Sequence, residues 1–386
     1  MNTIVKITGG KVLLPSGTFN ADVIVRDGII EDITAAPVEI PGAMIYDARG
    51  MHVVPGGIDL HIHGGGGCEF IEATEEAFRT GIDSHLQFGT TSILPTLPAC
   101  PVETIRKSVR ICEKLAEEPY SPVLGLHLEG PYLNPKKVGA IMPEYVTPPK
   151  KEDYESILDS TRVIKRWDLA PELPGAEEFI RCLREHSVLA SIAHTEAEYL
   201  DVLKAWECGA TLATHFYNAM SGVHNVREYK HEGTIESIYL IPDMAVEVIA
   251  DGKHVPPTIL NLIYRFKGSD RIALITDALG ASAGAGEKGI FDPRVIIEDG
   301  VCKLSDRSAL AGSIATMDIL IKTVVDAGIP FDEAIKMSSE TPAKIIGVED
   351  RKGTIEKGKD ADIVIYDNFC RLQFVMQRGR VVRNDL

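Results

Sequence analysis

Short apolar runs separated by turn residues mark both ends of the chain. Runs rich in Val and Ile that are bounded by Gly, Pro, Asn or Asp predict strands, and Asp27-Gly28 stands between two of them where a hairpin turn is expected. The strands predicted at the two ends are Ile4–Ile7, Val12–Leu14, Asp22–Arg26, Ile29–Ile33, Ala43–Asp47, Ala361–Tyr366, Arg371–Met376 and Arg380–Arg383. Since neither end is long enough for a core of its own, we expect residues 1–52 and 346–386 to form one small β-sandwich domain.

Between the two ends, apolar strands alternate with amphipathic, helix-like stretches. The predicted strands are Ile58–His63, Thr91–Thr96, Val123–Glu129, Val163–Ala170, Val188–His194, Thr211–Phe216, Met244–Ala250 and Ile272–Asp277. The predicted helices include Glu75–Phe88, Val102–Glu118, Ala176–His186, Glu196–Cys208 and Pro256–Phe266, with a hairpin at Val295–Ile297 and Val301–Leu304 and closing helices near Ser313–Ala327 and Phe331–Ser338. This alternation predicts an α/β fold, a (β/α)8 barrel of the TIM type over residues 53–345.

Composition and charge narrow the classes of partner. Of the 386 residues, 45% are hydrophobic and 25% are charged, as in ordinary globular proteins. The net charge of -16 argues against nucleic acid and anionic membranes as partners. Seven cysteines without a Cys-x-x-Cys pair indicate reduced thiols, and we find no signal-peptide pattern and no apolar stretch of membrane-spanning length. We therefore expect a cytoplasmic protein with no nucleic-acid or membrane partner.

His61 and His63 end the first predicted barrel strand. Side chains at i and i+2 of a strand point to the same face, so both imidazoles can reach one metal ion. Four glycines follow at once, Gly64 to Gly67, where the chain must turn and leaves the site open. The pair alone is also compatible with two histidines packed on a half-buried strand.

Other predicted strands of the barrel also end in metal-ligand side chains, namely Glu129, His194 and His215. Catalytic groups of such barrels lie at the carboxyl ends of the strands. Histidine and carboxylate ligands with one position left for water are typical of a catalytic zinc site. We therefore expect these three residues to form one ligand set and His61 with His63 a second, with Glu129 able to bridge them.

Asp277 ends the eighth predicted strand and is the expected general base. Burial should raise the pKa of this carboxyl group, and a nearby metal ion should lower it. Its expected role is to take a proton from water and to return it to a leaving amine.

Seven segments carry a resemblance to a known family: PGGIDLHIHG (55–64), HLEGPYLNPKKVGA (127–140), THFYNAM (214–220), IADGKHVPP (249–257), LITDALGA (274–281), LAGSIATMD (310–318) and KGTIEKGKDADIVIYD (352–367). Together they resemble the amidohydrolase superfamily and, within it, the N-acetylglucosamine-6-phosphate deacetylases. The resemblance covers nearly the whole chain. It implies metal-dependent hydrolysis of the N-acetyl amide of N-acetylglucosamine 6-phosphate, giving glucosamine 6-phosphate and acetate in amino-sugar catabolism.

The resemblance also implies roles for individual residues. It makes Glu129, His194 and His215 the metal ligands and Asp277 the general acid and base, with His61 and His63 allowing a second ion. The substrate-binding positions that it implies are Ala140, Asn218, Ala219, Arg227, His254, Leu310, Ala311 and Gly312. It implies one or two divalent ions per chain, zinc first, with Fe, Mn, Co or Ni also suited to such ligands. It further implies a homodimer, with Lys136, Lys137 and Lys230 as added candidates for binding the phosphate.

Two departures from the family pattern concern the substrate more than the reaction. Ile141 follows Gly139-Ala140, where members often carry His or Gln, and the segment from Arg227 to Gly233 is longer than usual and lacks proline. A deacetylase for another sugar, such as the galactosamine isomer, therefore stays open. Another N-acyl or cyclic-amide hydrolase is disfavoured because Lys165 lies early in the fourth predicted strand rather than at its end. A non-catalytic scaffold is disfavoured because the ligands are all retained.

Overall fold

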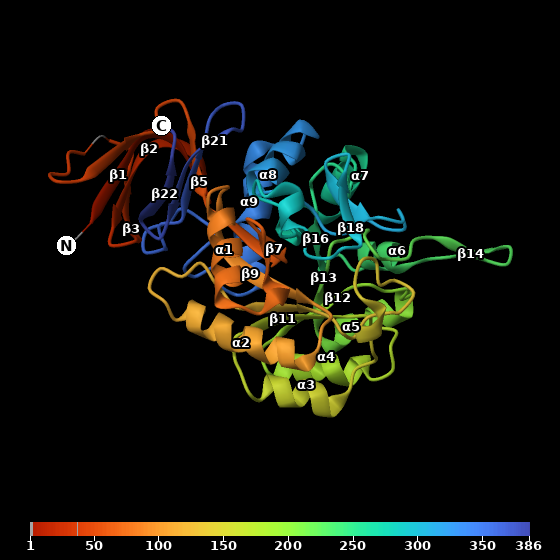
Figure 1. The fold of residues 1–386 in the computed structure, drawn as a ribbon. Helices are drawn as coiled ribbons and strands as arrows, with labels where there is room; N and C mark the ends of the chain where they lie inside the picture. The colour runs from red at the N-terminus through yellow and green to blue at the C-terminus, as the bar shows by residue number, and fades with distance from the viewer. Residues whose placement is uncertain (1–2, 37) are drawn as a thin grey trace.

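The two ends of the chain meet in one small β domain, at the left of Figure 1. The computed structural model describes residues 3–36 and 38–386. The domain contains β1 (Ile4–Leu14), β2 (Gly17–Arg26), β3 (Ile29–Thr34), β4 (Met44–Asp47), β5 (His52–Pro55), β20 (Ile363–Tyr366), β21 (Leu372–Gln377) and β22 (Arg380–Asn384). These strands make one eight-stranded sheet in the order β22-β21-β20-β5-β1-β2-β3, with β4 beside β1. The antiparallel pair of β5 with β20 joins the N-terminal part to the C-terminal part.

One apolar core fills this domain, so the two halves of the sheet face each other across it. Val23 of β2 packs in the same buried cluster as Ile363 of β20 and Phe374 of β21. The strands predicted as Ile4–Ile7 and Val12–Leu14 are a single strand, because a register shift lets β1 continue its pairing with β2. The predicted sandwich is thus a single sheet that curls around its core.

The rest of the chain forms a barrel of eight strands, which hydrogen-bond in chain order and run parallel. They are β6 (Gly57–Ile62), β9 (Thr90–Pro98), β10 (Leu126–Glu129), β11 (Ile164–Leu169), β12 (Leu189–Ile192), β13 (Ala210–Ala213), β16 (Ala245–Val248) and β17 (Ile272–Leu274). The backbone N–H of Asp277 donates to the carbonyl of His61 over 2.9 Å, which joins the last strand to the first. The predicted fold class is confirmed.

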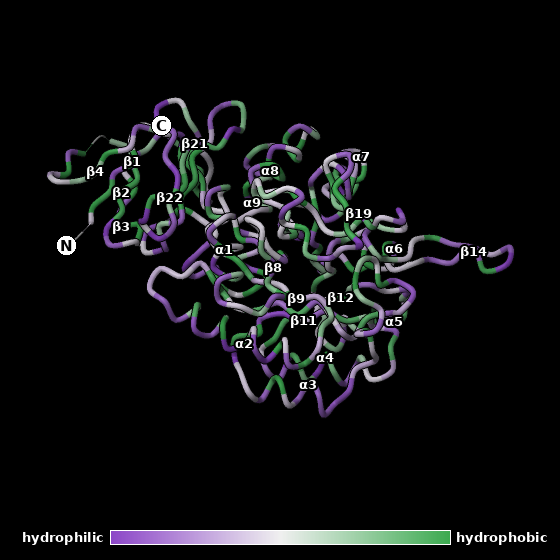
Figure 2. Tube along the Cα trace, in the orientation of Figure 1, coloured by the Kyte–Doolittle hydropathy of each residue, from purple (hydrophilic) through white to green (hydrophobic). Residues whose placement is uncertain are grey.

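Helices cover the outside of the barrel in Figure 1. They are α1 (Glu75–Leu86), α2 (Val102–Ala116), α3 (Lys151–Leu158), α4 (Ala176–Glu185), α5 (Tyr199–Cys208), α6 (Thr234–Tyr239), α7 (Pro257–Lys267), α8 (Met317–Asp326), α9 (Phe331–Ser338) and α10 (Glu340–Ile345). In α2, Ile105, Val109 and Cys112 are buried at helical spacing, so one stripe of the helix faces the barrel. Figure 2 shows hydrophobic residues concentrated on the strands and hydrophilic residues on the outer turns.

The sequence analysis did not predict α3, α6 or α10. All three are short, with 8, 6 and 6 residues, and a few turns give a weak periodic signal. Among the described residues, no helix is both long and apolar enough to cross a bilayer. The domain boundaries at residues 1–52 with 346–386 and at 53–345 stay predictions, and β5 lies across the first of them.

Several shorter elements accompany the strands and helices of the barrel. The hairpin of β14 (His224–Val226) and β15 (Tyr229–His231) projects at the right of Figure 1. The predicted hairpin after the eighth strand is present as β18 (Val295–Glu298) and β19 (Val301–Leu304). The remaining elements are β7 (Gly64–Gly65), β8 (Cys68–Glu69) and the 3-10 turns Phe70–Glu72, Pro143–Tyr145, Ser269–Arg271 and Gly286–Gly289.

Candidate metal centre and active site

Six side chains from the ends of barrel strands meet in one centre, and all of them except His61 line the floor of one pocket. Each of these residues is at most 7% exposed, and they are His61, His63, Glu129, His194, His215 and Asp277. His61 belongs to β6 and His63 follows it, Glu129 ends β10, and the other three lie two or three residues past the ends of β12, β13 and β17. The sequence analysis named all six, and the fold brings all six together.

Glu129, His194 and His215 form one group of potential ligands. Oε1 of Glu129 lies 3.1 Å from Nε2 of His194 and 3.0 Å from Nε2 of His215. The two Nε2 atoms are 3.1 Å apart. Three ligand atoms therefore converge on one point from three different strands.

His61 and His63 form the second group with the other face of Glu129. Their Nε2 atoms are 3.2 Å apart, so residues i and i+2 at the end of β6 reach the same point. Nε2 of His63 lies 3.3 Å from Oε2 of Glu129 and 3.1 Å from Oδ1 of Asp277. Oε1 of Glu129 thus faces His194 and His215 and, at 3.6 Å, His61, while Oε2 faces His63, so the carboxylate lies between the two histidine pairs.

The backbone turns sharply at three of these residues. His194, His215 and Asp277 have φ values of 45°, 31° and 48°, in the left-handed region that side chains other than glycine rarely adopt. Each stands just past the end of its strand, so the turn redirects a side chain into the barrel mouth. Such strain costs about 1–3 kcal/mol per residue and is found mainly at functional sites.

The donor set fits a divalent metal ion. Nδ1 of His194 lies 2.7 Å from the carbonyl oxygen of Lys137, which can only accept a hydrogen bond, so Nδ1 carries the proton and Nε2 presents a lone pair. That lone pair faces the carboxylate of Glu129, and two acceptors at 3.1 Å need a cation between or beside them. Imidazole nitrogens with a carboxylate oxygen are ligands that zinc and similar ions prefer.

The electrostatics of the centre also favour a cation. Burial opposes the charged form of His63, but Asp277 and Glu129 outweigh burial and raise the pKa of His63 to about 9. Burial likewise acts to raise the pKa of Asp277, yet His61 and His63 hold that pKa below its ordinary value. The expected rise from burial is therefore overcome by neighbouring imidazoles. The site is built to hold positive charge, which a metal ion supplies in exchange for protons.

A layer of buried charged residues lies beneath the centre, and the sequence analysis missed it. Arg166, Asp168 and Glu247 are all 0% exposed. Arg166 contacts Glu247 with both terminal nitrogens and Asp168 with Nε at 3.1 Å. The signal was present in the sequence, because Arg166 and Asp168 are two residues apart on one predicted strand and therefore share one face.

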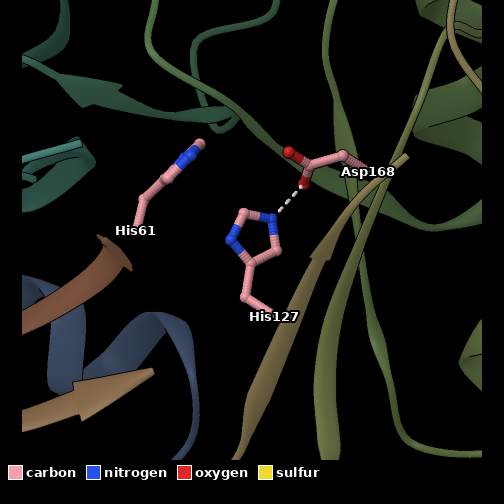
Figure 3. Close-up of side chains that lie close together, drawn as sticks. All are labelled: His61, His127 and Asp168. Atoms are coloured by element: carbon pink, nitrogen blue, oxygen red, sulfur yellow. Dashed lines mark ion pairs between the residues drawn. The ribbon is translucent and has the colours of Figure 1, made fainter. Parts of the chain in front are cut away.

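A third group of potential ligands, His61, His127 and Asp168, carries no metal in our interpretation. Figure 3 shows the His127 ring between the other two side chains. Nε2 of His127 lies 3.0 Å from Oδ1 of Asp168, and Arg166 contacts the same oxygen at 3.1 Å. A metal ion there would face the guanidinium charge, so the group supports the centre instead.

The pocket above the centre has a volume of about 660 Å³. All but one of the expected substrate-binding residues line it, namely Ala140, Asn218, Ala219, His254, Leu310, Ala311 and Gly312. Nδ1 of His254 lies 2.8 Å from Oδ2 of Asp251, which leaves Nε2 as the nitrogen for the pocket. Ile141 also lines the pocket, as an apolar wall that is 8% exposed.

Arg227 is the exception. It lies in the turn of the β14–β15 hairpin and is not among the residues that line the pocket of its own chain. Lys230 is on the same hairpin, whereas Lys136 and Lys137 line the pocket. The expected set of phosphate-binding cations is therefore divided between two places.

Three further pocket residues escaped the sequence analysis: Glu69, Phe291 and Arg294. Arg294 donates to the carbonyl of Ala140 over 2.8 Å, and Phe291 is 54% exposed at the pocket. All three belong to connections after β7 or β17, where no periodic pattern indicates which residues turn inward.

Known proteins share this architecture. A 33% identical N-acetylglucosamine-6-phosphate deacetylase from Bacillus subtilis aligns over 94% of this chain and 92% of its own length. A 30% identical N-acetylgalactosamine-6-phosphate deacetylase from Escherichia coli O157:H7 aligns over 92% and 93%. The crystal structure of N-acetylglucosamine-6-phosphate deacetylase from Pasteurella multocida has a TM-score of 0.91 at 28% identity and covers 99% of this chain and 100% of its own.

The pattern that describes the amidohydrolase family matches residues 52–382, from β5 into β22. The match includes every strand of the barrel and all six side chains of the centre. The resemblance expected from the sequence motifs is confirmed. This chain belongs to the amidohydrolase family.

Proposed function

We propose that this protein hydrolyses the N-acetyl amide of N-acetylglucosamine 6-phosphate to glucosamine 6-phosphate and acetate. The observation that carries the proposal is the convergence of five metal-ligand side chains and Asp277 in one centre, which forms the floor of the pocket through all of them except His61. The names of the relatives support an amino-sugar phosphate as substrate. Water and the amide are consumed, and an amine and a carboxylate are released.

A divalent ion held by Glu129, His194 and His215 would supply the Lewis acid that polarises the amide carbonyl and activates water. Asp277 is placed to accept the proton of that water, because its carboxylate faces the same point as the ligands. It then returns the proton to the amide nitrogen as the C–N bond breaks. Nε2 of His254 is the proposed hydrogen-bond partner of the carbonyl oxygen, held in place by Asp251.

The walls of the pocket orient the substrate in this proposal. Asn218 and Ala219 would contact the sugar, and Leu310, Ala311 and Gly312 would pack against the acetyl group. Ala219 has a φ of 52°, and the N–H of Asn218 is held by the carbonyl of His215. The turn that carries Asn218 and Ala219 is therefore hydrogen-bonded directly to His215, a proposed metal ligand.

We propose two ions per chain, with zinc as the first candidate. The support is the position of Glu129 between the two histidine pairs, with Oε1 toward His194 and His215 and Oε2 toward His63. Buried charge adds support, because four carboxylates lie in or just beneath the centre and Arg166 pairs with only two of them, Asp168 and Glu247. The other two are Glu129 and Asp277. Two divalent ions would compensate the excess of negative charge.

We also propose a homodimer in which Arg227 of one subunit binds the phosphate in the pocket of the other. The support is the position of Arg227 on a projecting hairpin, away from its own pocket (Figure 1). Tyr229 and Val226 on the same hairpin are 66% and 45% exposed, as expected for residues that a partner covers. The cytoplasmic location expected from the cysteines stays a prediction.

The galactosamine isomer is the second candidate substrate. Ile141 supports this second candidate, because its apolar side chain offers no hydrogen bond to the sugar at the pocket wall. The relative named for that isomer is 30% identical to this chain and aligns over 92% of it. The two sugars differ only in the configuration of one hydroxyl group.

One assay tests the proposed function. Acetate release is measured for the 6-phosphates of N-acetylglucosamine and N-acetylgalactosamine and for both sugars without phosphate, on protein whose metal content is known. We expect the highest kcat/KM for N-acetylglucosamine 6-phosphate. Preference for the galactosamine isomer would select the second candidate, and no release from any of the four would refute the proposal.

A further inference from the structure

Glu247 is the carboxylate closest to the back of His61. Its Oε2 lies 3.5 Å from Nδ1 of His61, the ring nitrogen on the side away from the metal centre, and both residues are 0% exposed. Nε2 of the same ring faces Glu129 at 3.6 Å and Asp277 at 3.5 Å. His61 is thus held between a carboxylate behind it and the proposed ligands in front of it.

His127 fixes the plane of the His61 ring. The two rings meet edge to face, with centroids 4.7 Å apart and an interplanar angle of 79°. Figure 3 shows the other edge of His127 turned toward Asp168, to which an ion-pair contact is drawn. Nδ1 of His127 lies 3.0 Å from Oγ1 of Thr96. His127 therefore has a defined orientation of its own and cannot rotate freely.

Arg166 holds both carboxylates that stand behind these rings. It contacts Glu247 through both terminal nitrogens and Asp168 through Nε. It also donates to the carbonyl of Leu60 over 3.2 Å and to Oγ1 of Thr214 over 2.7 Å. Leu60 precedes His61 and Thr214 precedes His215, so one guanidinium group connects the strands that carry ligands of both halves of the centre.

This network is a costly way to stabilise a barrel. Buried ion pairs pay a large desolvation penalty, and apolar residues of similar volume are often as stabilising or more so. A carboxylate that accepts from the far nitrogen of a histidine, in contrast, fixes the tautomer whose near nitrogen binds metal. Glu247 stands on that far side of His61, with Oε2 3.5 Å from Nδ1, where such a carboxylate acts.

We propose that Arg166 is a positioning residue for the metal centre. By holding Glu247 against Nδ1 of His61, it keeps the proton on that nitrogen and the lone pair of Nε2 on the metal side. Its effect is therefore selective for the ion that His61 and His63 hold. This inference rests on the metal centre of the proposed function and adds a residue that touches neither metal nor substrate.

The decisive variant is Glu247→Gln. Both oxygens of Glu247 accept from Arg166, and the closer contact is at Oε1, so the amide oxygen of Gln takes that position. Its NH2 group then takes the place of Oε2, the atom that faces Nδ1 of His61. A donor at that position favours the tautomer with the proton on Nε2, which cannot bind metal. Arg166→Lys is the second variant. One ammonium group keeps the charge but cannot form the bidentate hydrogen bonds by which Arg166 holds two carboxylates at once.

The measurement is equilibrium dialysis of the full-length protein against buffers of graded free Zn²⁺, with bound zinc counted per chain. We expect both variants to lower the affinity for one ion by about 10- to 100-fold and to leave the affinity for the other within about twofold. Asp362→Asn is the matched control, a buried carboxylate that pairs with Lys352 in the small domain at 2.5 Å. It should lower the melting temperature and leave both zinc affinities unchanged.

Three results would overturn the positioning role: unchanged affinity for both ions in Glu247→Gln, an equal loss for both ions, or a wild-type chain that binds one ion only. Acetate release by the wild-type protein separates this inference from the proposed function. If the wild-type protein releases acetate and Glu247→Gln binds zinc as the wild type does, only the positioning role is refuted. If Glu247→Gln selectively loses one ion and the wild-type protein releases no acetate, only the proposed function is refuted.

Discussion

Oδ1 of Asp277 and Nε2 of His63 lie 3.1 Å apart at the floor of the pocket. The two residues come from opposite ends of the barrel sequence, and the hydrogen bond from the N–H of Asp277 to the carbonyl of His61 sets the distance between them. Barrel closure thus places the proposed general base directly against the metal-ligand pair of the first strand. A base in that position can reach a water molecule at the centre without further movement.

The first prediction concerns Asp277. Asp277→Asn removes the group that accepts and returns the proton, so kcat should fall by about 10²- to 10⁴-fold. The histidines and Glu129 are unchanged, so zinc content should stay near that of the wild type. Steady-state acetate release and metal analysis on the same preparation check both parts. Near-normal turnover would refute the role of Asp277.

The second prediction concerns Arg227 and the dimer. Arg227→Ala should raise KM for the phosphorylated sugar far more than for the unphosphorylated one, because the lost contact is to phosphate. Arg227→Ala and Asp277→Asn proteins, each nearly inactive at low substrate, should regain activity when they are co-expressed. Each mixed dimer then contains one complete site, which corresponds to roughly a quarter of wild-type activity for random pairing. No recovery would mean that Arg227 does not serve the neighbouring subunit.

The third prediction concerns pH and His85. Burial lowers the pKa of His85 from 6.5 to about 4, since the ring lies between α1 and the Gly64 turn with Ser282 at 2.9 Å. Between pH 6.5 and about 4 the unfolded imidazole binds a proton that the folded one does not, so the free energy of unfolding should fall as pH falls. His85 should contribute up to about 3 kcal/mol of this loss.

Chemical denaturation at several pH values measures that slope. His85→Gln, which keeps a polar side chain but cannot be protonated, should be less stable at neutral pH and show a shallower decline below pH 6.5. A slope equal to that of the wild type would assign the acid sensitivity to other groups.

The fourth prediction concerns metal removal. An ion that binds only the folded chain stabilises it by about 4 kcal/mol when its free concentration is a thousand times Kd. Chelation should therefore lower the melting temperature, and added Zn²⁺ should restore it. The double variant His61→Ala with His63→Ala should lose one ion per chain and keep the other. Loss of both ions would show that the two halves of the centre bind cooperatively.

Local sequence patterns predicted most of the barrel. The runs that became β6, β9 and β17 are rich in apolar residues and are buried along almost their whole length, because strands inside a barrel are covered on both faces. The helices α1, α2 and α4 were predicted because each spans at least ten residues with a clear apolar stripe. The short helices α3 and α6 were missed because they are stabilised by packing against neighbours more than by their own periodicity.

The sequence by itself determined which side chains stand at the strand ends, and a parallel barrel brings all such ends to one rim. That is why Glu129, His194 and Asp277 could be grouped before any coordinates were known. Only the tertiary structure decided that Arg166 pairs with Glu247 behind His61 and that Arg227 does not line the pocket of its own chain. Those relationships join residues far apart in the chain through side-chain direction and loop path, which no local period encodes.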